Sequence, residues 1–222
     1  MFSSIQEWEQ KRIGKITASK AFLVMKEGKG KAFSDPTLKY IDELASEFLT
    51  KTACNSERFQ AAATEWGNAN EFFALDRFKK DKGFKDEDIV FYGGSNPVFF
   101  EFTERSGGSP DGRAADWLLE VKCPYNSGIH LNYLKISNLD EFKKECEGYY
   151  WQMVMNMLCL GVEKGYFISY DPRYIHEQLQ IKILEVTPKK EDFESFKKRL
   201  TMAENLLTET ILSVASSILA DQ

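Results

Sequence analysis

The sequence lacks the long hydrophobic runs and cysteine pairs that define several large classes of protein. It contains no stretch of about 18 apolar residues, so we expect no membrane span. Its N-terminus, MFSSIQEWEQKR, lacks the apolar core of a secretory signal. The cysteines, at positions 54, 123, 146 and 159, form no C-x-x-C pair, which argues against a structural zinc site and against a secreted disulfide framework. We therefore expect a protein of the reducing cytoplasm.

The composition is that of a soluble globular protein. The chain has 222 residues, of which 43% are hydrophobic and 28% are charged. No internal repeat, low-complexity segment or linker interrupts it, so residues 1–222 are expected to form a single domain. The net charge is −5, yet residues 11–31 carry seven Lys or Arg and one acid, Glu27. Such a basic segment on an acidic body can bind phosphates, although a solvated charged face explains the charges equally well.

Hydrophobic periodicity divides the chain into three parts. Residues up to about 85 are predicted to be helical, with one helix after Ser34 and another from near Ser56 to just before Gly83. The middle part, about 86–186, is predicted to contain a sheet and its flanking helices. A long helix is expected over about 187–220. The predicted strands are 89–93, 97–104, 116–123, 165–172 and 177–186, with a helix before Gly161. This order predicts an α/β (α+β) fold, a central mixed β-sheet flanked by helices.

The segment SGGSPDGRAADWLLEVKCP, residues 106–124, places charged residues inside a strand that otherwise resembles core. Alternation along the strand puts Glu120 and Lys122 on the face opposite Val121. Burying an unpaired carboxylate costs several kcal/mol, so such a group is normally paired or bound to a metal. A hairpin would bring Asp111 beside Glu120, and two carboxylates, a backbone carbonyl and waters suit Mg²⁺ or Mn²⁺. Lys122 would then orient or deprotonate a water, which predicts metal-assisted phosphodiester hydrolysis.

The Glu-x-Lys pattern alone is a weak signal, because it occurs four times in the chain. Only Glu120 and Lys122 lie in an apolar strand that follows a glycine-flanked Asp. The alternative is a surface hairpin in which Glu120 and Lys122 form an ion pair of small value.

Further motifs in the expected order resemble those of one nuclease family. SPDG followed by LEVKCP resembles the PD-(D/E)xK core, and more specifically the lambda-exonuclease branch of YqaJ-like viral recombinases. The N-terminal W-x3-R-x-G-x-I-T-A-S pattern is present at 8–19, and WGNANE at 66–71 resembles the G-x3-E helix motif. Y-x2-Q follows at 149–152, and GYFISYDPR at 165–173 resembles the next strand. The resemblance covers residues 8–173.

This resemblance implies a restriction-endonuclease-like core and a 5′→3′ exonuclease that acts on double-stranded DNA ends in phage-type recombination. It implies Mg²⁺ dependence with a two-metal site, in which Mn²⁺ can substitute. It also implies a toroidal homotrimer and a single-strand annealing protein as partner, within the bacterial host cytoplasm. The implied metal ligands are Asp111, Glu120, Glu71 and the Val121 carbonyl. The other implied site residues are Lys122 and Gln152 for catalysis and Arg12, Ser19, Ser109, Tyr149 and Trp8 for the 5′-phosphate and DNA.

Several alternatives remain at the level of sequence. Taken singly, Arg12 can be a helix-surface residue, Ser19 a helix cap and Glu71 an exposed helical acid. Other functions are a PD-(D/E)xK endonuclease, a RecB-like nuclease and a DNA-end-binding protein without activity. The iron–sulfur RecB-like nucleases need clustered cysteines, which this chain lacks. His130 and His176 fit no catalytic pattern, and residues 124–142 receive no assignment.

Overall fold

The structure is a computed structural model that describes residues 4–54, 61–94 and 96–220. Eight α-helices lie within these ranges. They are α1 Ser4–Arg12, α2 Ala21–Val24, α3 Asp35–Thr50, α4 Ala61–Lys82, α5 Ser127–Leu134, α6 Leu139–Glu145, α7 Glu147–Leu160 and α8 Lys190–Ala220. Short 3₁₀ turns are η1 Ala18–Lys20, η2 Asp86–Asp88 and η3 Glu177–Leu179. The strands are β1 Ile16–Thr17, β2 Val90–Phe91, β3 Phe100–Thr103, β4 Ser106–Gly108, β5 Gly112–Arg113, β6 Leu118–Lys122, β7 Gly165–Tyr170 and β8 Ile181–Val186.

A five-stranded mixed sheet in the order β2-β5-β6-β7-β8 forms the centre of the fold. Strand β6 is its middle strand, antiparallel to β5 and parallel to β7. A second sheet of three strands, β1-β4-β3, lies beside it, and its β1–β4 pair is parallel. Because β4 and β5 lie close in sequence, the turn at 109–111 links the two sheets directly.

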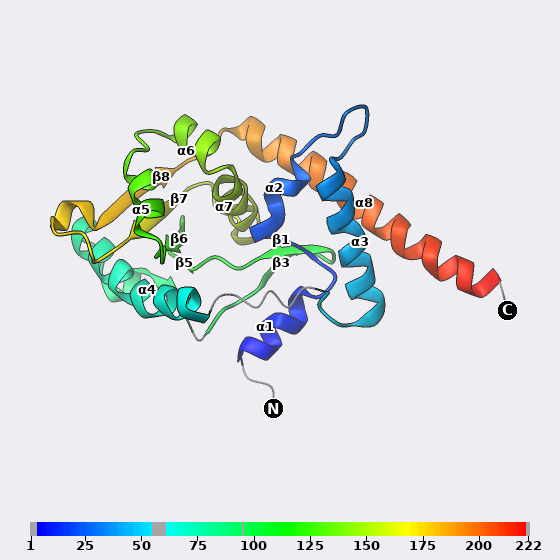
Figure 1. Cartoon of the computed structure of the whole chain (residues 1–222), viewed down its shortest axis with the longest axis horizontal. Helices are drawn as coiled ribbons and strands as arrows, with labels where there is room; N and C mark the ends of the chain where they lie inside the picture. The colour runs from blue at the N-terminus through cyan, green and yellow to red at the C-terminus, as the bar shows by residue number, and fades with distance from the viewer. Residues whose placement is uncertain (1–3, 55–60, 95, 221–222) are drawn as a thin grey trace.

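Helices cover both faces of the central sheet (Figure 1). Alternate residues of β6 enter different cores, as the strand period requires. Leu119 and Val121 belong to a core that includes residues of α4, whereas Leu118 belongs to a larger core that contains α7. Helix α8 packs along α3 and extends beyond the rest of the molecule towards the C-terminus (Figure 1). In the described ranges, every helix is too short or too polar to cross a bilayer.

The structure confirms the mixed α/β class and refines several predicted boundaries. The predicted strand 177–186 begins only at Ile181, because that residue pairs with Tyr170, the last residue of β7. Residues 177–179 instead form a 3₁₀ turn. The predicted strand 97–104 begins only at Phe100. Pro97 has no backbone N–H to donate to a neighbouring strand, which disfavours an earlier start. The predicted start of a helix near Ser56 lies outside the described residues.

Candidate active site

The β5–β6 hairpin places Asp111 against strand β6, as the sequence predicted. The Asp111 backbone N–H donates to the Leu119 carbonyl at 3.1 Å. In the other direction, the Val121 N–H donates to Asp111 Oδ2 at 2.7 Å. The carboxylate therefore accepts a backbone hydrogen bond from β6 and is held level with the middle of that strand.

Glu120 is fully buried in the middle of β6. Its Oε1 accepts from Lys122 Nζ at 2.5 Å and from Gln152 Nε2 at 2.6 Å. Its Oε2 lies 3.4 Å from Asn156 Nδ2. Burial raises the pKa of Glu120, and repulsion from Asp111 and Glu71 adds to this rise, while Lys122 opposes it. The surface-hairpin alternative is thereby excluded, because an exposed ion pair would not bury its carboxylate.

Lys122 connects the two carboxylates of the hairpin. Its Nζ lies 2.5 Å from Glu120 Oε1 and 3.6 Å from Asp111 Oδ2. Burial lowers the pKa of Lys122, but Asp111 and Glu120 outweigh burial, so this pKa lies well above its ordinary value. The side chain is 24% exposed, and it lies 5.4 Å from the ring centroid of Tyr149. Lys122 is therefore an ammonium at neutral pH, suited to donating hydrogen bonds rather than to removing a proton.

Glu71 approaches the same strand from α4. Its Oε2 accepts from the Gly94 backbone N–H at 3.0 Å. Burial raises the pKa of Glu71, and the charge of Asp111 raises it further. A third carboxylate therefore interacts electrostatically with the hairpin. An acid exposed on the surface of a helix would have no such interaction.

The donor chemistry of this cluster fits a hard divalent cation. Three carboxylates share a partly buried region, and the two with raised pKa values, Glu120 and Glu71, would be stabilised as anions by added positive charge. Among the described residues, no three His, Cys, Asp or Glu side chains converge as a ready coordination shell. Instead the Lys122 ammonium balances Asp111 and Glu120. We conclude that these residue types suit a divalent cation. In this structure the carboxylates of Asp111 and Glu120 are instead arranged around the Lys122 ammonium.

Three of the residues expected at the 5′-phosphate and DNA, Trp8, Arg12 and Ser109, come from distant segments and meet beside this hairpin. Trp8 Nε1 donates to Ser109 Oγ at 2.7 Å, and the Arg12 guanidinium stacks on the Trp8 ring at 4.0 Å. The parallel β1–β4 pair explains this meeting, because it joins Ile16 to Ser106. Ser109 is two residues from Asp111, so these groups lie at the edge of the acidic cluster.

A groove of about 540 Å³ adjoins the cluster through Gln152. Ser19, Tyr149 and Gln152 all line it, together with Lys26 and Lys144. Gln152 therefore contacts the buried Glu120 and also reaches the groove. The groove thus joins one position predicted for catalysis, Gln152, to two predicted for substrate contact, Ser19 and Tyr149.

Comparison with known proteins identifies the family. The model of the YqaJ-like viral recombinase domain matches residues 7–163. The chain belongs to this family. No curated protein matches it. Membership of the family supports a nuclease function in phage-type recombination.

Solved structures share the fold over almost the whole chain. An alkaline exonuclease from Laribacter hongkongensis is 23% identical, with a TM-score of 0.78 over 98% of this chain and 100% of the other. The same enzyme in complex with dAMP is 26% identical, with a TM-score of 0.77 over the same shares. A phage-related exonuclease from Haemophilus somnus is 16% identical, with a TM-score of 0.69 over 90% of this chain and 96% of the other. The chain is therefore similar to these proteins in fold over at least 90% of its length.

Sequence reasoning missed one polar residue in this YqaJ-like site. Asn156 is fully buried in α7, and its amide faces the second oxygen of Glu120. The signal was present, because Asn156 lies one helical turn after Gln152 on an otherwise apolar helix. A side chain at Gly108 would collide with it, since a Cβ there would lie 2.0 Å from Asn156 Oδ1. The glycine before Ser109 thus makes room for a site residue.

Proposed function

We propose that this protein is a Mg²⁺-dependent 5′→3′ exonuclease that degrades one strand of linear double-stranded DNA and leaves 3′ single-stranded overhangs for recombination. The observation that carries the proposal is the buried Glu120, bound by Lys122 and Gln152 beside Asp111. A buried carboxylate with acidic neighbours is costly for stability and is explained by a catalytic role.

Each side chain of the cluster has a part in the proposed hydrolysis. A bound divalent cation would supply Lewis-acid activation of the phosphodiester and a more acidic water. Asp111, Glu120, Glu71 and the Val121 carbonyl are the proposed ligands. Lys122, as an ammonium, would hold the nucleophilic water and offset the negative charge that builds up on the phosphorus oxygens. Gln152 keeps Glu120 oriented from α7 at 2.6 Å.

Recognition of the DNA end is assigned to the residues beside the hairpin. A guanidinium binds a terminal phosphate through two parallel hydrogen bonds, which suits Arg12. Its stacking on Trp8 and the Trp8–Ser109 hydrogen bond support a preformed arrangement. Ser19 and Tyr149 line the adjoining groove, where a nucleotide next to the scissile bond would lie.

Linear duplexes that differ only in their 5′-phosphate test this proposal. With Mg²⁺ we expect progressive shortening from the 5′ end, faster with the phosphate present, and EDTA should abolish it. Covalently closed circular DNA should stay intact, because no end is available; nicking would indicate a PD-(D/E)xK endonuclease or RecB-like activity instead. Equal activity of the wild type and of Asp111→Ala would refute the assignment of the site.

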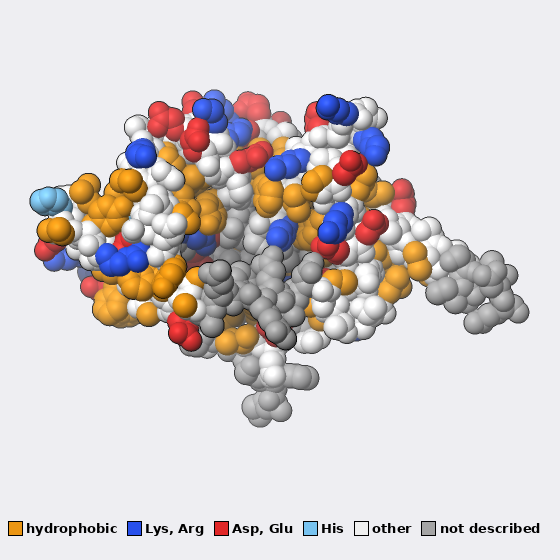
Figure 2. All heavy atoms as spheres, viewed as in Figure 1, with side chains coloured by type: hydrophobic (Ala, Val, Ile, Leu, Met, Phe, Trp, Pro, Cys, Tyr) orange, Lys and Arg blue, Asp and Glu red, His pale blue; other side chains and the backbone are white. Residues whose placement is uncertain are grey.

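We also propose that the chain forms a homotrimer around DNA and acts with a single-strand annealing protein. Figure 2 shows hydrophobic side chains gathered where α4, α5 and the β7–β8 connection meet the surface. Exposed apolar residues of these segments include Phe72, Phe73, Ile129, Leu131, Ile175 and Leu179. Such patches favour association. Light scattering of the purified protein tests the trimer, and a mass of 25.5 kDa at all concentrations would contradict it.

A further inference from the structure

An ion pair with a buried carboxylate and a partly exposed guanidinium lies just beyond the ends of the parallel strands β6 and β7. Strand β7 ends at Tyr170, and the register of β6 with β7 matches Lys122 with Ser169. Asp171 is the first residue after β7, and Pro124 is the second residue after β6. Asp171 is fully buried, which requires a charged partner at this edge of the sheet. This is the edge at which the carboxyl ends of the two parallel strands meet.

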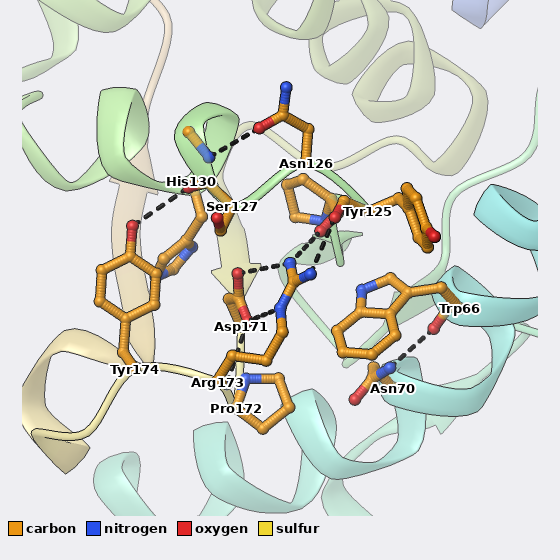
Figure 3. A network of polar contacts seen from close by, with 12 residues as sticks. Trp66, Asn70, Tyr125, Asn126, Ser127, His130, Asp171, Pro172, Arg173 and Tyr174 are labelled. Atoms are coloured by element: carbon orange, nitrogen blue, oxygen red, sulfur yellow. Dashed lines mark hydrogen bonds and ion pairs between the residues drawn. The ribbon is translucent and has the colours of Figure 1, made fainter.

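Arg173 is that partner, and it also holds the segment that follows β6. Its Nε and Nη2 bind the two oxygens of Asp171 at 2.8 and 2.7 Å. Its Nη1 donates to the Tyr125 carbonyl at 3.0 Å, and its Nη2 donates to the Pro124 carbonyl at 3.2 Å. Figure 3 shows the guanidinium directed between Asp171 and this segment. One planar group thus fixes the backbone two and three residues after Lys122.

The other side of the same guanidinium holds α4. Its carbon lies 4.3 Å from the centroid of the Trp66 ring, and the Tyr125 ring meets that indole edge-on at 6.3 Å (Figure 3). The buried Trp66 Nε1 has no hydrogen-bond partner in the part of the chain that the structure describes, so stacking is what positions the ring. Asn70 Nδ2 donates to the Trp66 carbonyl at 2.8 Å, and the next residue is Glu71.

We propose that Arg173 is a positioning residue that sets the spacing between Glu71 on α4 and Lys122 on β6, and through it the affinity of the acidic cluster for its divalent cation. This inference rests on the proposed function. Glu71 and the β6 hairpin come from separate elements, and the contacts of Arg173 tie α4 to the chain directly after β6. Groups that orient metal ligands in this indirect way change metal affinity by about 10- to 100-fold when they are altered.

The test compares variants by their affinity for Mn²⁺ alone. Arg173→Lys keeps a cation beside Asp171, but it loses the paired hydrogen bonds to the two carboxylate oxygens and the flat surface that stacks on Trp66. Trp66→Leu removes the stacking partner and leaves Arg173 with its hydrogen bonds. Arg77→Lys is the matched control, because Arg77 also binds a carboxylate with its Nε, that of Asp81 on the same helix at 2.9 Å. Titration calorimetry is carried out at a temperature where circular dichroism shows each variant folded.

We expect the Mn²⁺ dissociation constant to rise about 10-fold for Arg173→Lys and for Trp66→Leu, and to stay within about twofold for the control. A purely structural role would lower the melting temperature and leave the Mn²⁺ affinity of the folded protein unchanged, and that result would overturn the inference. If Arg173→Lys does not fold, Trp66→Leu decides alone. Failure of the wild type to bind Mn²⁺ would instead remove the proposed function itself.

Discussion

Glu120 is a buried carboxylate whose charge is balanced by one ammonium, that of Lys122, while two amides contact its oxygens. Removing a partner from a buried ion costs more than the pair is worth, because the remaining charge stays desolvated. The four groups therefore act as a unit, and substitutions of single members are expected to be non-additive.

Lys122→Ala is expected to lower kcat by at least about 100-fold, since it removes the charge that holds the water and offsets the transition state. DNA affinity should change little, because the basic N-terminal segment and the end-binding residues are unaltered. Single-turnover degradation and DNA binding in Ca²⁺ measure the two quantities. Lys164→Ala is the control, since Lys164 also binds a carboxylate, Asp116 at 2.9 Å, on the surface. Turnover by Lys122→Ala equal to that of the control would contradict its role.

Gly108 and Asn156 give a second prediction at this scale. Gly108→Ala should destabilise the protein by about 1–3 kcal/mol, because its Cβ would lie 2.0 Å from Asn156 Oδ1. The pair Gly108→Ala/Asn156→Ala should recover much of this loss, since the colliding amide is gone. Denaturant unfolding of both single variants and of the double variant forms the cycle. Strictly additive losses would mean that Gly108 does not serve to accommodate Asn156.

At the scale of elements, α7 and the β5–β6 hairpin were largely predictable from sequence. The turn glycines and Asp111 indicated the hairpin, and Gly161, with φ of 69°, ends α7 where expected. The β1–β4 pairing was not predictable, because β4 is only Ser106–Gly108 and its partner has two residues. Strands this short have no alternation to detect. The Arg173–Trp66 contact was missed for a related reason, since it joins residues 107 positions apart in sequence.

Asp192 joins three helices and gives a prediction on pH. Its carboxylate, at the start of α8, binds Lys143 Nζ of α6 and the Tyr150 hydroxyl of α7, each at 2.6 Å. Burial raises the pKa of Asp192, but these partners outweigh it, so the pKa is lowered. A lowered folded-state pKa contributes stability above the unfolded value, near 3.9, that is lost as pH falls through the folded value.

Asp192→Asn should therefore cost about 2 kcal/mol of unfolding free energy at pH 7. The difference from the wild type should shrink as the pH is lowered below about 4, because the wild-type carboxylate is then protonated as well. Urea unfolding across this pH range measures it. A deficit that is independent of pH would show that packing, rather than the charge of Asp192, holds α8 in place.

At the scale of the whole molecule, charge is distributed unevenly. The net charge is −5, while residues 11–31 are strongly basic. Within that segment Lys11 and Lys15 pair with Glu7 and Glu101. Lys26, by contrast, lines the groove that also contains Gln152. The acidic surface repels DNA, so the basic segment is expected to determine which face of the protein meets the duplex.

The double variant Lys26→Gln/Lys29→Gln should therefore weaken DNA binding and make it less sensitive to salt. The slope of log affinity against log salt concentration is negative, and its magnitude decreases by about 0.9 for each phosphate that the protein no longer neutralises. Removing both lysines would therefore decrease this magnitude by about 1.8. The control is Lys197→Gln/Lys198→Gln, which removes the same charge from the exposed face of α8. Both double variants remove the same charge, so their effects can differ only through a local interaction with DNA. Equal weakening by the two would show that net charge, rather than this segment, governs binding.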